Sequence, residues 1–399
     1  GGIDRWDNTR QEVITEDRLL IDGRSKAPDY SFGLGGERKF FVEAKKPSVD
    51  LAANWEPAYQ LRTYAWTATL PVSLLTDFEE LAIYDCRIEP KKLDKPTIAR
   101  IEYFRFDQLV ERWDWFSGLF HRDAVAAGSL EEYAKELPKK RGAQSFDAAF
   151  LKELEEWREL LAADIAKRNH TLDAATLTDA VQRMIDRILF LRFAEDRAIE
   201  QYGLLKTLQT EKGIYAKLFD IFQTADRRYN SGLFHFRKER ARSGDVDTLA
   251  GTLLVGDEPL KQIISRLYYP DSPYAFSVIP ADILGQVYER FLGKVITLGA
   301  RHSVKVEEKP EVRKAGGVFY TPTWVVREIV RRTIGRAFEG NTAEEMENFR
   351  TLDPACGSGS FLLGAFDALL SWHRDHYVAN QPKKWETAGR IIKAGDNYR

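Results

Sequence analysis

The sequence contains two stretches that decide its fold: Pro28-Asp29 followed by Glu43-Ala44-Lys45, and the run Asp353-Pro354-Ala355-Cys356-Gly357-Ser358-Gly359-Ser360. Around the first stretch, the β-forming residues Lys39 to Ala44 predict a strand. The second stretch is a glycine-rich turn of the kind that joins a strand to a helix. Both ends of the chain are therefore expected to be α/β.

The first stretch has the residue types of a site that holds a divalent cation. Hydrolysis of a phosphodiester needs such a cation to neutralise developing charge and to activate water. Magnesium prefers carboxylate oxygens, and Asp29 and Glu43 supply two carboxylates. The strand period of two places Glu43 and Lys45 on one face, so the Lys45 ammonium group is expected beside the metal, where it can orient the attacking water. Ala44 faces the other way, where a small apolar residue suits the core.

The surrounding residues support this interpretation. Asp29 precedes Glu43 by fourteen residues, a gap that fits two strands joined by a turn at Gly33 to Gly36. On the next expected helix, Gln60 and Tyr64 lie at positions i and i+4 and so share one helix face.

These features resemble the PD-(D/E)xK nuclease superfamily, and Gln60 and Tyr64 resemble the QxxxY element of its RecB-like members and of many restriction enzymes. The resemblance implies a magnesium-dependent nuclease. A helix acid before the first strand often completes such sites, which makes Glu16 a third metal ligand and Glu12 a weaker candidate. For the short motif alone, a solvated pair of Glu43 and Lys45 is the alternative. The implied site has the catalytic residues Asp29, Glu43, Lys45, Gln60 and Tyr64 and the metal ligands Asp29, Glu43 and Glu16.

The second stretch has the features of a nucleotide-binding turn. Gly357 and Gly359 let the backbone approach a ligand closely, and a helix that begins near Phe361 offers free N–H groups. Residues 350–352 are expected to end the strand before the turn. The full run resembles motif I of the amino-methyltransferases that act on adenine N6, which implies S-adenosylmethionine as the cofactor, with Asp353 near its amino group. The implied cofactor-binding residues in this run are Asp353, Ala355, Cys356, Gly357, Gly359 and Phe361.

A second segment, Gly317-Val318-Phe319-Tyr320-Thr321-Pro322, agrees with this cofactor. It resembles the Gly-x-Phe/Tyr-Thr-Pro stretch that precedes motif I in γ-type adenine methyltransferases. The resemblance assigns Phe319, Tyr320 and Thr321 to the cofactor pocket. Taken alone, the segment would be a turn followed by a helix capped by Thr321 or Thr323.

Other parts of a methyltransferase are missing from the sequence. No acidic residue stands where one would hold the ribose hydroxyls, because Asp396 comes too early and lies in a turn-like context. The catalytic Asn/Asp-Pro-Pro-Tyr/Phe segment and a target-recognition region are absent as well. The chain is therefore expected not to methylate DNA by itself, and whether adenine is the methylated base stays open.

Residue patterns divide the chain into three expected domains. Residues 1–140 are expected to form an α/β nuclease domain with a PD-(D/E)xK-like mixed sheet. Residues 141–310 are dominated by a helical period and predict an all-α connector. Residues 311–399 predict the incomplete beginning of a Rossmann-like methyltransferase domain. The expected elements are strands at 72–76, 81–85 and 101–106, helices at 55–70 and 324–338, and a basic linker at 138–142.

Composition sets outer limits on function. Hydrophobic residues make up 44% and charged residues 30% of the 399 residues, as in soluble globular proteins. No apolar run is long enough to span a membrane, the first residues form no signal peptide, and the lack of an initiator Met indicates a missing or processed N-terminus. The two cysteines exclude a disulfide framework and a cysteine-based zinc site and suit a reducing cytoplasm. His373 and His376 have no third ligand nearby, which favours an exposed helix end over a metal site.

The order of these parts resembles the N-terminal portion of the Type IIG (Type IIL-like) restriction–modification enzymes, which defend against phage. It implies double-stranded DNA as the partner; the formal net charge of −2 does not oppose this, because localised basic residues suffice. Two copies are expected to meet transiently on DNA. The alternatives are a phage-defence DNA adenine methyltransferase whose N-terminal domain merely clamps DNA, and a non-catalytic DNA-binding or assembly module. The sequence does not determine the recognition site, the cutting distance or the oligomeric state.

Overall fold

The computed structural model of the protein describes residues 6, 12–15, 20–21, 24–25, 27–34, 37–138, 144–229, 231–238, 245–299, 303–309, 321, 323–356, 359–394 and 397–398. The chain divides into two units, one made of Gly1–Pro280 with Phe291–Arg313 and the other of Ala281–Arg290 with Lys314–Arg399. The expected domains 1–140 and 141–310 thus lie largely in the first unit. Their separation from each other stays a prediction.

The first unit contains a mixed six-stranded sheet in the order β1-β4-β5-β6-β7-β8. Only β5 and β6 pair in parallel, because helix α1 (Trp55–Thr67) crosses over between them; the other neighbours are antiparallel. The strands predicted for this sheet are found close to their expected bounds. The strands of the sheet are β1 (Val13–Ile14), β4 (Tyr30–Leu34), β5 (Glu37–Ala44), β6 (Val72–Thr76), β7 (Glu80–Asp85) and β8 (Arg100–Arg105). A separate pair is formed by β2 (Leu20–Ile21) and β3 (Arg24–Ser25).

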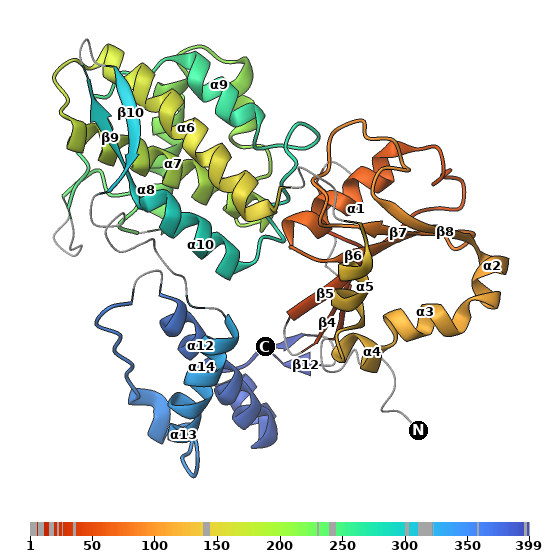
Figure 1. Ribbon diagram of the computed structural model, residues 1–399. Helices are drawn as coiled ribbons and strands as arrows, with labels where there is room; N and C mark the ends of the chain where they lie inside the picture. Colours follow the sequence, from red (N-terminus) through yellow and green to blue (C-terminus); the bar gives the residue numbers. More distant parts are fainter. Residues whose placement is uncertain are drawn as a thin grey trace. The chain divides into compact units, whose positions relative to one another are not determined.

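The sheet separates two cores, one on each face. Consecutive residues of a strand point to opposite faces, and the fully buried Phe41 packs on the side of α1 while Phe40 packs on the other side. The second face is covered by helices α3 to α5, as Figure 1 shows. This alternation places Glu43, two residues after Phe41, on the α1 face. The covering helices are α3 (Trp113–Phe120), α4 (Arg122–Ala126) and α5 (Ser129–Glu136), and the short α2 (Phe106–Glu111) precedes them.

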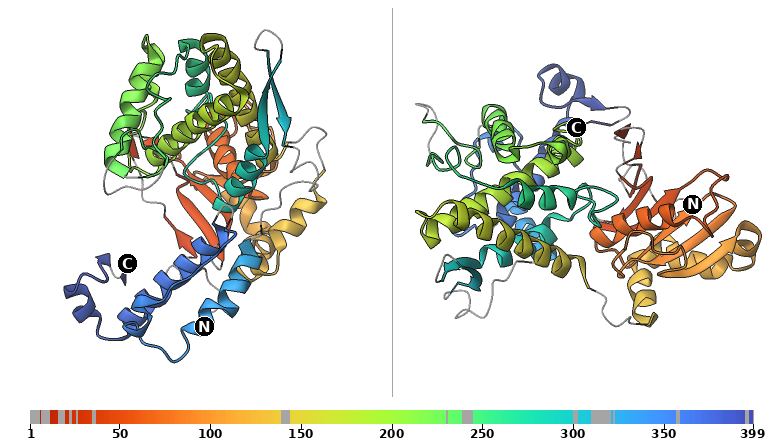
Figure 2. Two further views of the ribbon diagram at one scale, coloured as in Figure 1. Left: turned by 90° about the vertical axis from the view of Figure 1, so that its left-hand side faces the viewer. Right: turned by 90° about the horizontal axis from the view of Figure 1, so that it is seen from above.

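The rest of the first unit is a helical body built on the long helices α6 (Phe146–Arg168) and α7 (Ala174–Asp196), which pack against each other. Apolar residues of both helices, among them Leu154, Trp157, Val181 and Ile188, are buried in its core. The expected all-α connector also carries a hairpin, β9 (Lys294–Leu298) with β10 (Val304–Glu308), which lies against α6 and α7 (Figure 2). Its β-branched residues favour strand over helix. The body also contains α8 (Ile214–Tyr229), α9 (Asp257–Ser265) and the 3-10 helix η2 (Lys206–Thr210).

The second unit is mostly helical where the structure describes it, with one short strand pair near its end. Its small core forms where α12 (Thr323–Arg332) meets α14 (Ser360–Ala379). The predicted helix at 324–338 is divided at Thr333 into α12 and α13 (Ile334–Ala337). The remaining elements are α10 (Ala281–Leu292), η4 (Glu345–Asn348), α15 (Pro382–Thr387), β11 (Lys393–Ala394) and β12 (Asn397–Tyr398).

The expected strand end at 350–352 is wrong. Residues 350–352 belong to no helix or strand and pair with no strand in the described part of the chain, and Leu352 is 85% exposed. A strand needs a neighbour to satisfy its backbone N–H and C=O groups, and a local pattern cannot supply one. No helix among the described residues is long and apolar enough to cross a membrane.

Helices α12 and α14 approach closely because α14 has a glycine at their contact. A Cβ added at Gly364 would lie 2.8 Å from Val326 Cγ1. Gly364→Ala is therefore expected to speed amide hydrogen exchange in α12 and α14, since overpacking of about 1–3 kcal/mol outweighs the gain in helix propensity. Gly118 in α3 has nothing within 4 Å of an added Cβ. Gly118→Ala should instead stabilise its helix by up to about 1 kcal/mol. If Gly364→Ala slowed amide exchange in α12 and α14, the close packing of these helices would be contradicted.

Candidate nuclease site and cofactor-binding turn

The pairing of β4 with β5 brings two acidic side chains together at one end of the sheet. Tyr30 pairs with Val42, so Asp29, just before β4, lies beside the last residues of β5. The Asp29 carboxylate oxygen Oδ2 accepts a hydrogen bond of 2.8 Å from the backbone N–H of Ala44. This bond fixes Asp29 next to Glu43. Ala44 itself is half-buried on the opposite face of the strand, and not part of the core as expected.

Lys45 joins this carboxylate pair to helix α1. Its Nζ donates to Glu43 Oε1 at 2.5 Å and to Gln60 Oε1 at 3.0 Å. The backbone N–H of Lys45 donates to Thr76 O at 2.8 Å and so continues the pairing of β5 with β6. One turn further along α1, the Tyr64 hydroxyl accepts from Gln60 Nε2 at 3.5 Å. The structure thus places all five predicted catalytic residues in one connected group.

Glu43 is the buried centre of this group, with 1% of its surface exposed. Burial raises the pKa of the Glu43 carboxyl from its usual 4.5 to about 7; the Lys45 ammonium opposes the shift and the Asp29 carboxylate adds to it. Its Oε2 is buried and has no hydrogen-bond partner among the described residues. An unpaired buried carboxylate oxygen is costly, and a divalent cation would satisfy it. The donor set therefore fits a metal site.

The third predicted metal ligand, Glu16, lies outside the described residues. Within the part of the chain that the structure describes, no group of three His, Cys, Asp or Glu side chains is arranged to hold a metal ion. Asp29 and Glu43 remain as two carboxylates, a number that suits magnesium, which keeps several waters. The weaker candidate Glu12 lies in a bend, and both its carboxylate oxygens accept hydrogen bonds from Arg122, at 2.5 and 2.8 Å. They are thus already engaged.

The raised pKa of Glu43 makes a prediction about stability without metal. The folded protein binds a proton at Glu43 up to about pH 7 and the unfolded chain only up to its usual pKa of 4.5, so the free energy of unfolding falls as pH rises between these values. Glu43→Gln removes the ionised form. In a chelator at pH 8 it should raise the free energy of unfolding by up to about 3 kcal/mol, measured by denaturant titration.

The gain from Glu43→Gln should disappear at pH 4, where the parent carboxyl is protonated in both states. Glu111→Gln at an exposed position of α2 is the matched control and should change stability by less than about 0.5 kcal/mol at either pH. A Glu43→Gln variant that is less stable than the parent at pH 8 would contradict the assigned burial of charge.

In the second unit, the described residues of the predicted glycine-rich stretch, 353–356 and 359–360, lead directly into α14. Asp353 Oδ1 accepts from the Ala355 N–H at 3.1 Å, and the Gly359 N–H donates to Cys356 O at 2.8 Å. Gly359 has a φ of 79°, in the left-handed region that favours glycine, and it directly precedes the helix. Ala355 and Cys356 are exposed at this place.

The other predicted cofactor residues have mixed outcomes. Phe361 packs against the core between α12 and α14, and Thr321 is half-buried just ahead of α12. Gly357, Phe319 and Tyr320 lie outside the described residues. Thr321 and Gly359 thus lie just before two helices, α12 and α14, that pack together.

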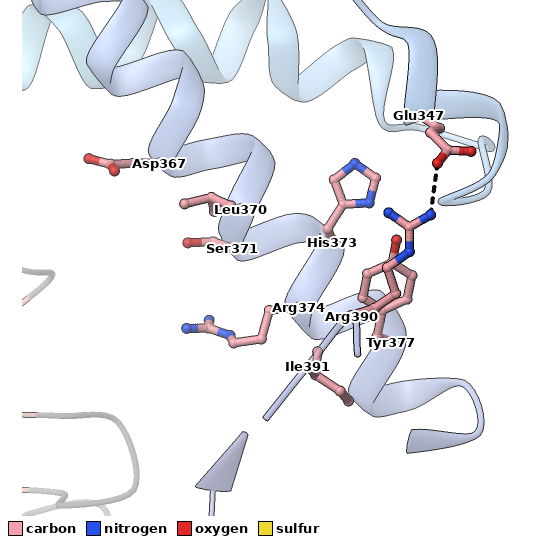
Figure 3. A pocket seen from close by; sticks show the side chains of 9 residues that line it. All are labelled: Glu347, Asp367, Leu370, Ser371, His373, Arg374, Tyr377, Arg390 and Ile391. Atoms are coloured by element: carbon pink, nitrogen blue, oxygen red, sulfur yellow. Dashed lines mark hydrogen bonds and ion pairs between the residues drawn. The ribbon is translucent and has the colours of Figure 1, made fainter. Parts of the chain in front are cut away.

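A hollow of about 600 Å³ in the second unit lies away from these residues. Figure 3 shows its lining by the later half of α14, including Asp367, His373 and Arg374, and by an ion pair of 2.8 Å between Glu347 and Arg390. Burial lowers the pKa of the His373 imidazole, and neighbouring His376 and Arg390 act in the same direction. None of the predicted cofactor-binding residues lines the hollow.

Comparison with known proteins places the chain in context. A family model described as N-6 DNA Methylase matches residues 280–381. The Escherichia coli protein described as "Type II restriction enzyme and methyltransferase RM.Eco57I" is 37% identical over 376 residues, which cover 94% of this chain and 36% of that protein. The chain is a homologue of a Type II restriction enzyme and methyltransferase. It spans 36% of the length of that relative.

One solved structure also matches. The type IIG restriction endonuclease BpuSI shares 14% sequence identity over 91% of this chain and 35% of its own, with a TM-score of 0.24, and this likeness carries no argument about the fold. The restriction–modification homology and the methylase match confirm the family resemblance. The family-model match begins with α10, which groups with the second unit, whereas the sequence pattern predicted a boundary at 310.

Sequence reasoning missed the contacts between α1 and a distant segment near Pro270. The Tyr59 hydroxyl donates to Pro270 O, 211 positions away along the chain. No periodicity or short motif signals a contact over such a separation.

Proposed function

We propose that this chain is part of a restriction–modification enzyme and carries a magnesium-dependent DNA endonuclease of the PD-(D/E)xK type. The observation that carries the proposal is the buried, unpaired oxygen of Glu43, beside Asp29 and bonded through its other oxygen to Lys45. The homologous Type II restriction enzyme supports it. An inert DNA clamp would gain nothing from a buried carboxylate with an unsatisfied oxygen.

In the proposed mechanism, Asp29 and Glu43 would hold magnesium, which would supply a lowered pKa for a bound water and positive charge against the phosphate. Lys45 lies against Glu43 and is held by Gln60, so its ammonium group is directed at the place where the water attacks and negative charge develops. Tyr64 fixes the amide of Gln60 and thereby the position of Lys45.

The second unit is proposed to be the beginning of a Rossmann-like adenine-N6 methyltransferase that binds S-adenosylmethionine. The methylase match supports this assignment. The backbone around Ala355 and Cys356 would lie against the cofactor, and Asp353 would face its amino group. S-adenosylmethionine supplies the methyl group for transfer. Phe319, Tyr320 and Thr321 would complete the pocket.

The proposed substrate and partner is double-stranded DNA. Because the chain has one proposed nuclease site, cutting both strands would require two copies to meet on DNA. Glu16 is proposed as the third metal ligand. The proposed domains comprise residues 1–140, 141–310 and 311–399.

Lys45→Ala in the full-length protein tests the nuclease. Loss of the ammonium group beside Glu43 should lower magnesium-dependent cleavage of plasmid DNA by on the order of 100- to 1,000-fold, while the circular dichroism spectrum stays that of the parent. Lys46→Ala is the matched control, because Lys46 is the exposed neighbour and its side chain lies outside the group. Equal cleavage by Lys45→Ala, Lys46→Ala and the parent would refute the nuclease assignment.

Asp353→Asn tests the cofactor assignment. The amide can still accept the bond from Ala355 N–H, so the turn is kept and only the charge is lost. Calorimetric affinity of the full-length protein for S-adenosylmethionine should fall about 10-fold, as expected for one charged hydrogen bond of about 1.5 kcal/mol. Asp375→Asn, on the exposed side of α14, should leave the affinity unchanged. Unaltered binding by Asp353→Asn would remove Asp353 from the cofactor site.

A further inference from the structure

Helix α1 carries Gln60 and Tyr64 toward the proposed nuclease site, and it is held elsewhere along its length by residues 267–278, here called the strap. Near the start of α1, the buried Tyr59 hydroxyl donates to Pro270 O at 3.1 Å. At its end, Thr67 Oγ1 accepts from the Ala275 N–H at 3.2 Å. The strap thus holds both ends of the helix.

The strap is in turn fixed by helix α7 of the helical body. Arg192 is almost fully buried, and its Nε donates to Leu267 O at 2.9 Å. Its guanidinium lies 4.6 Å from the ring centre of Tyr268 and 5.0 Å from that of Phe276. The Tyr268 hydroxyl lies 2.8 Å from each carboxylate oxygen of Glu195. Charged and aromatic contacts therefore attach the strap to α7.

The same elements reach the site residue Tyr64. Its side chain shares a core cluster with Ala275 and Val278 of the strap. Burial raises the pKa of the Tyr64 hydroxyl, and the charge of Glu43 raises it further. Asp196 in α7 and Tyr269 in the strap make weaker contributions in the same direction. Tyr64 thus lies within electrostatic reach of the site on one side and of the helical body on the other.

We infer that the strap sets the position of α1 in the nuclease site and that Tyr59 is a positioning residue for DNA cleavage. The inference rests on the nuclease function proposed above. Among the described residues, the Tyr59 hydroxyl bonds to the strap and not to Asp29, Glu43 or Lys45. It therefore acts through α1, which determines where Gln60 holds Lys45. Catalytic groups must be held within a fraction of an ångström, so a loosened α1 lowers the rate without removing any catalytic group. The helical body then contributes to DNA cleavage by holding α1 in position.

Tyr59→Phe tests this with a matched control, Tyr84→Phe. Both hydroxyls are in buried tyrosines of the same sheet-containing part and both donate to a backbone carbonyl, Tyr59 to Pro270 in the strap and Tyr84 to Pro96 outside it. The two variants should show similar falls in the midpoint of denaturant unfolding, because each loses a buried hydroxyl that donates to a backbone carbonyl. Only Tyr59→Phe should lower kcat for magnesium-dependent cleavage by the full-length protein, by on the order of 10-fold, with KM for DNA unchanged.

Thr67→Val supplies a second variant at the other end of α1, because it keeps the shape of the side chain and removes the acceptor for Ala275 N–H. It should show the same fall in kcat at constant KM. Equal rates for Tyr59→Phe, Thr67→Val and Tyr84→Phe would overturn the inference. Lys45→Ala, measured in parallel, distinguishes failure of the inference from failure of the proposed nuclease function. If Lys45→Ala is inactive and Tyr59→Phe is fully active, only the positioning role is refuted. If Lys45→Ala is active, the nuclease function is refuted and the inference with it.

Discussion

The burial of one carboxylate, that of Glu43, is the constraint on which the first unit depends. Removing a carboxylate from water is strongly unfavourable, and here only one of its two oxygens is paired, with Lys45. The surrounding core offsets this cost: Phe41, Leu61 and Leu75 are completely buried in the same cluster. Strained or poorly solvated groups persist where the rest of a structure holds them in place, and they gather at functional sites.

Helix α1 packs against this core and positions the polar residues beside Glu43. It covers the sheet face that carries Glu43, and it also forms the crossover that makes β5 and β6 parallel. Its polar residues Gln60 and Tyr64 reach Lys45, while Tyr59 and Thr67 bind the strap. The sheet and the helical body therefore share one helix. This explains why residues 208 to 211 positions apart can act on one proposed site.

The two units contrast in how much apolar surface they bury. The first has a core on each face of its sheet, whereas α12 and α14 bury only a narrow stripe around Val326 and Ala365. Leu363, Phe366 and Leu370 of α14 are each more than half exposed. Two packed helices can cover only one face of each other, so the remaining apolar face of α14 has no cover within the described residues.

The sequence by itself determined the local parts of this protein. Alternation predicted β5 and β6, helix spacing placed Gln60 and Tyr64 on one face, and the Asp29-to-Glu43 gap predicted a strand pair; the structure contains all of these. The roles of these residues in catalysis stay predictions. Such features depend on backbone geometry within a few residues, which is why they can be read from sequence.

Only the tertiary structure decided which polar groups meet and which elements find partners. The expected strand at 350–352 has no described neighbour, a hairpin interrupts the expected all-α connector, and Glu12 is bound by Arg122. The burial of Glu43 and the strap behind α1 likewise arise from contacts between distant segments. A strand, a buried charge and a positioned helix are each defined by their neighbours, and those neighbours are brought together by the packing of the whole unit.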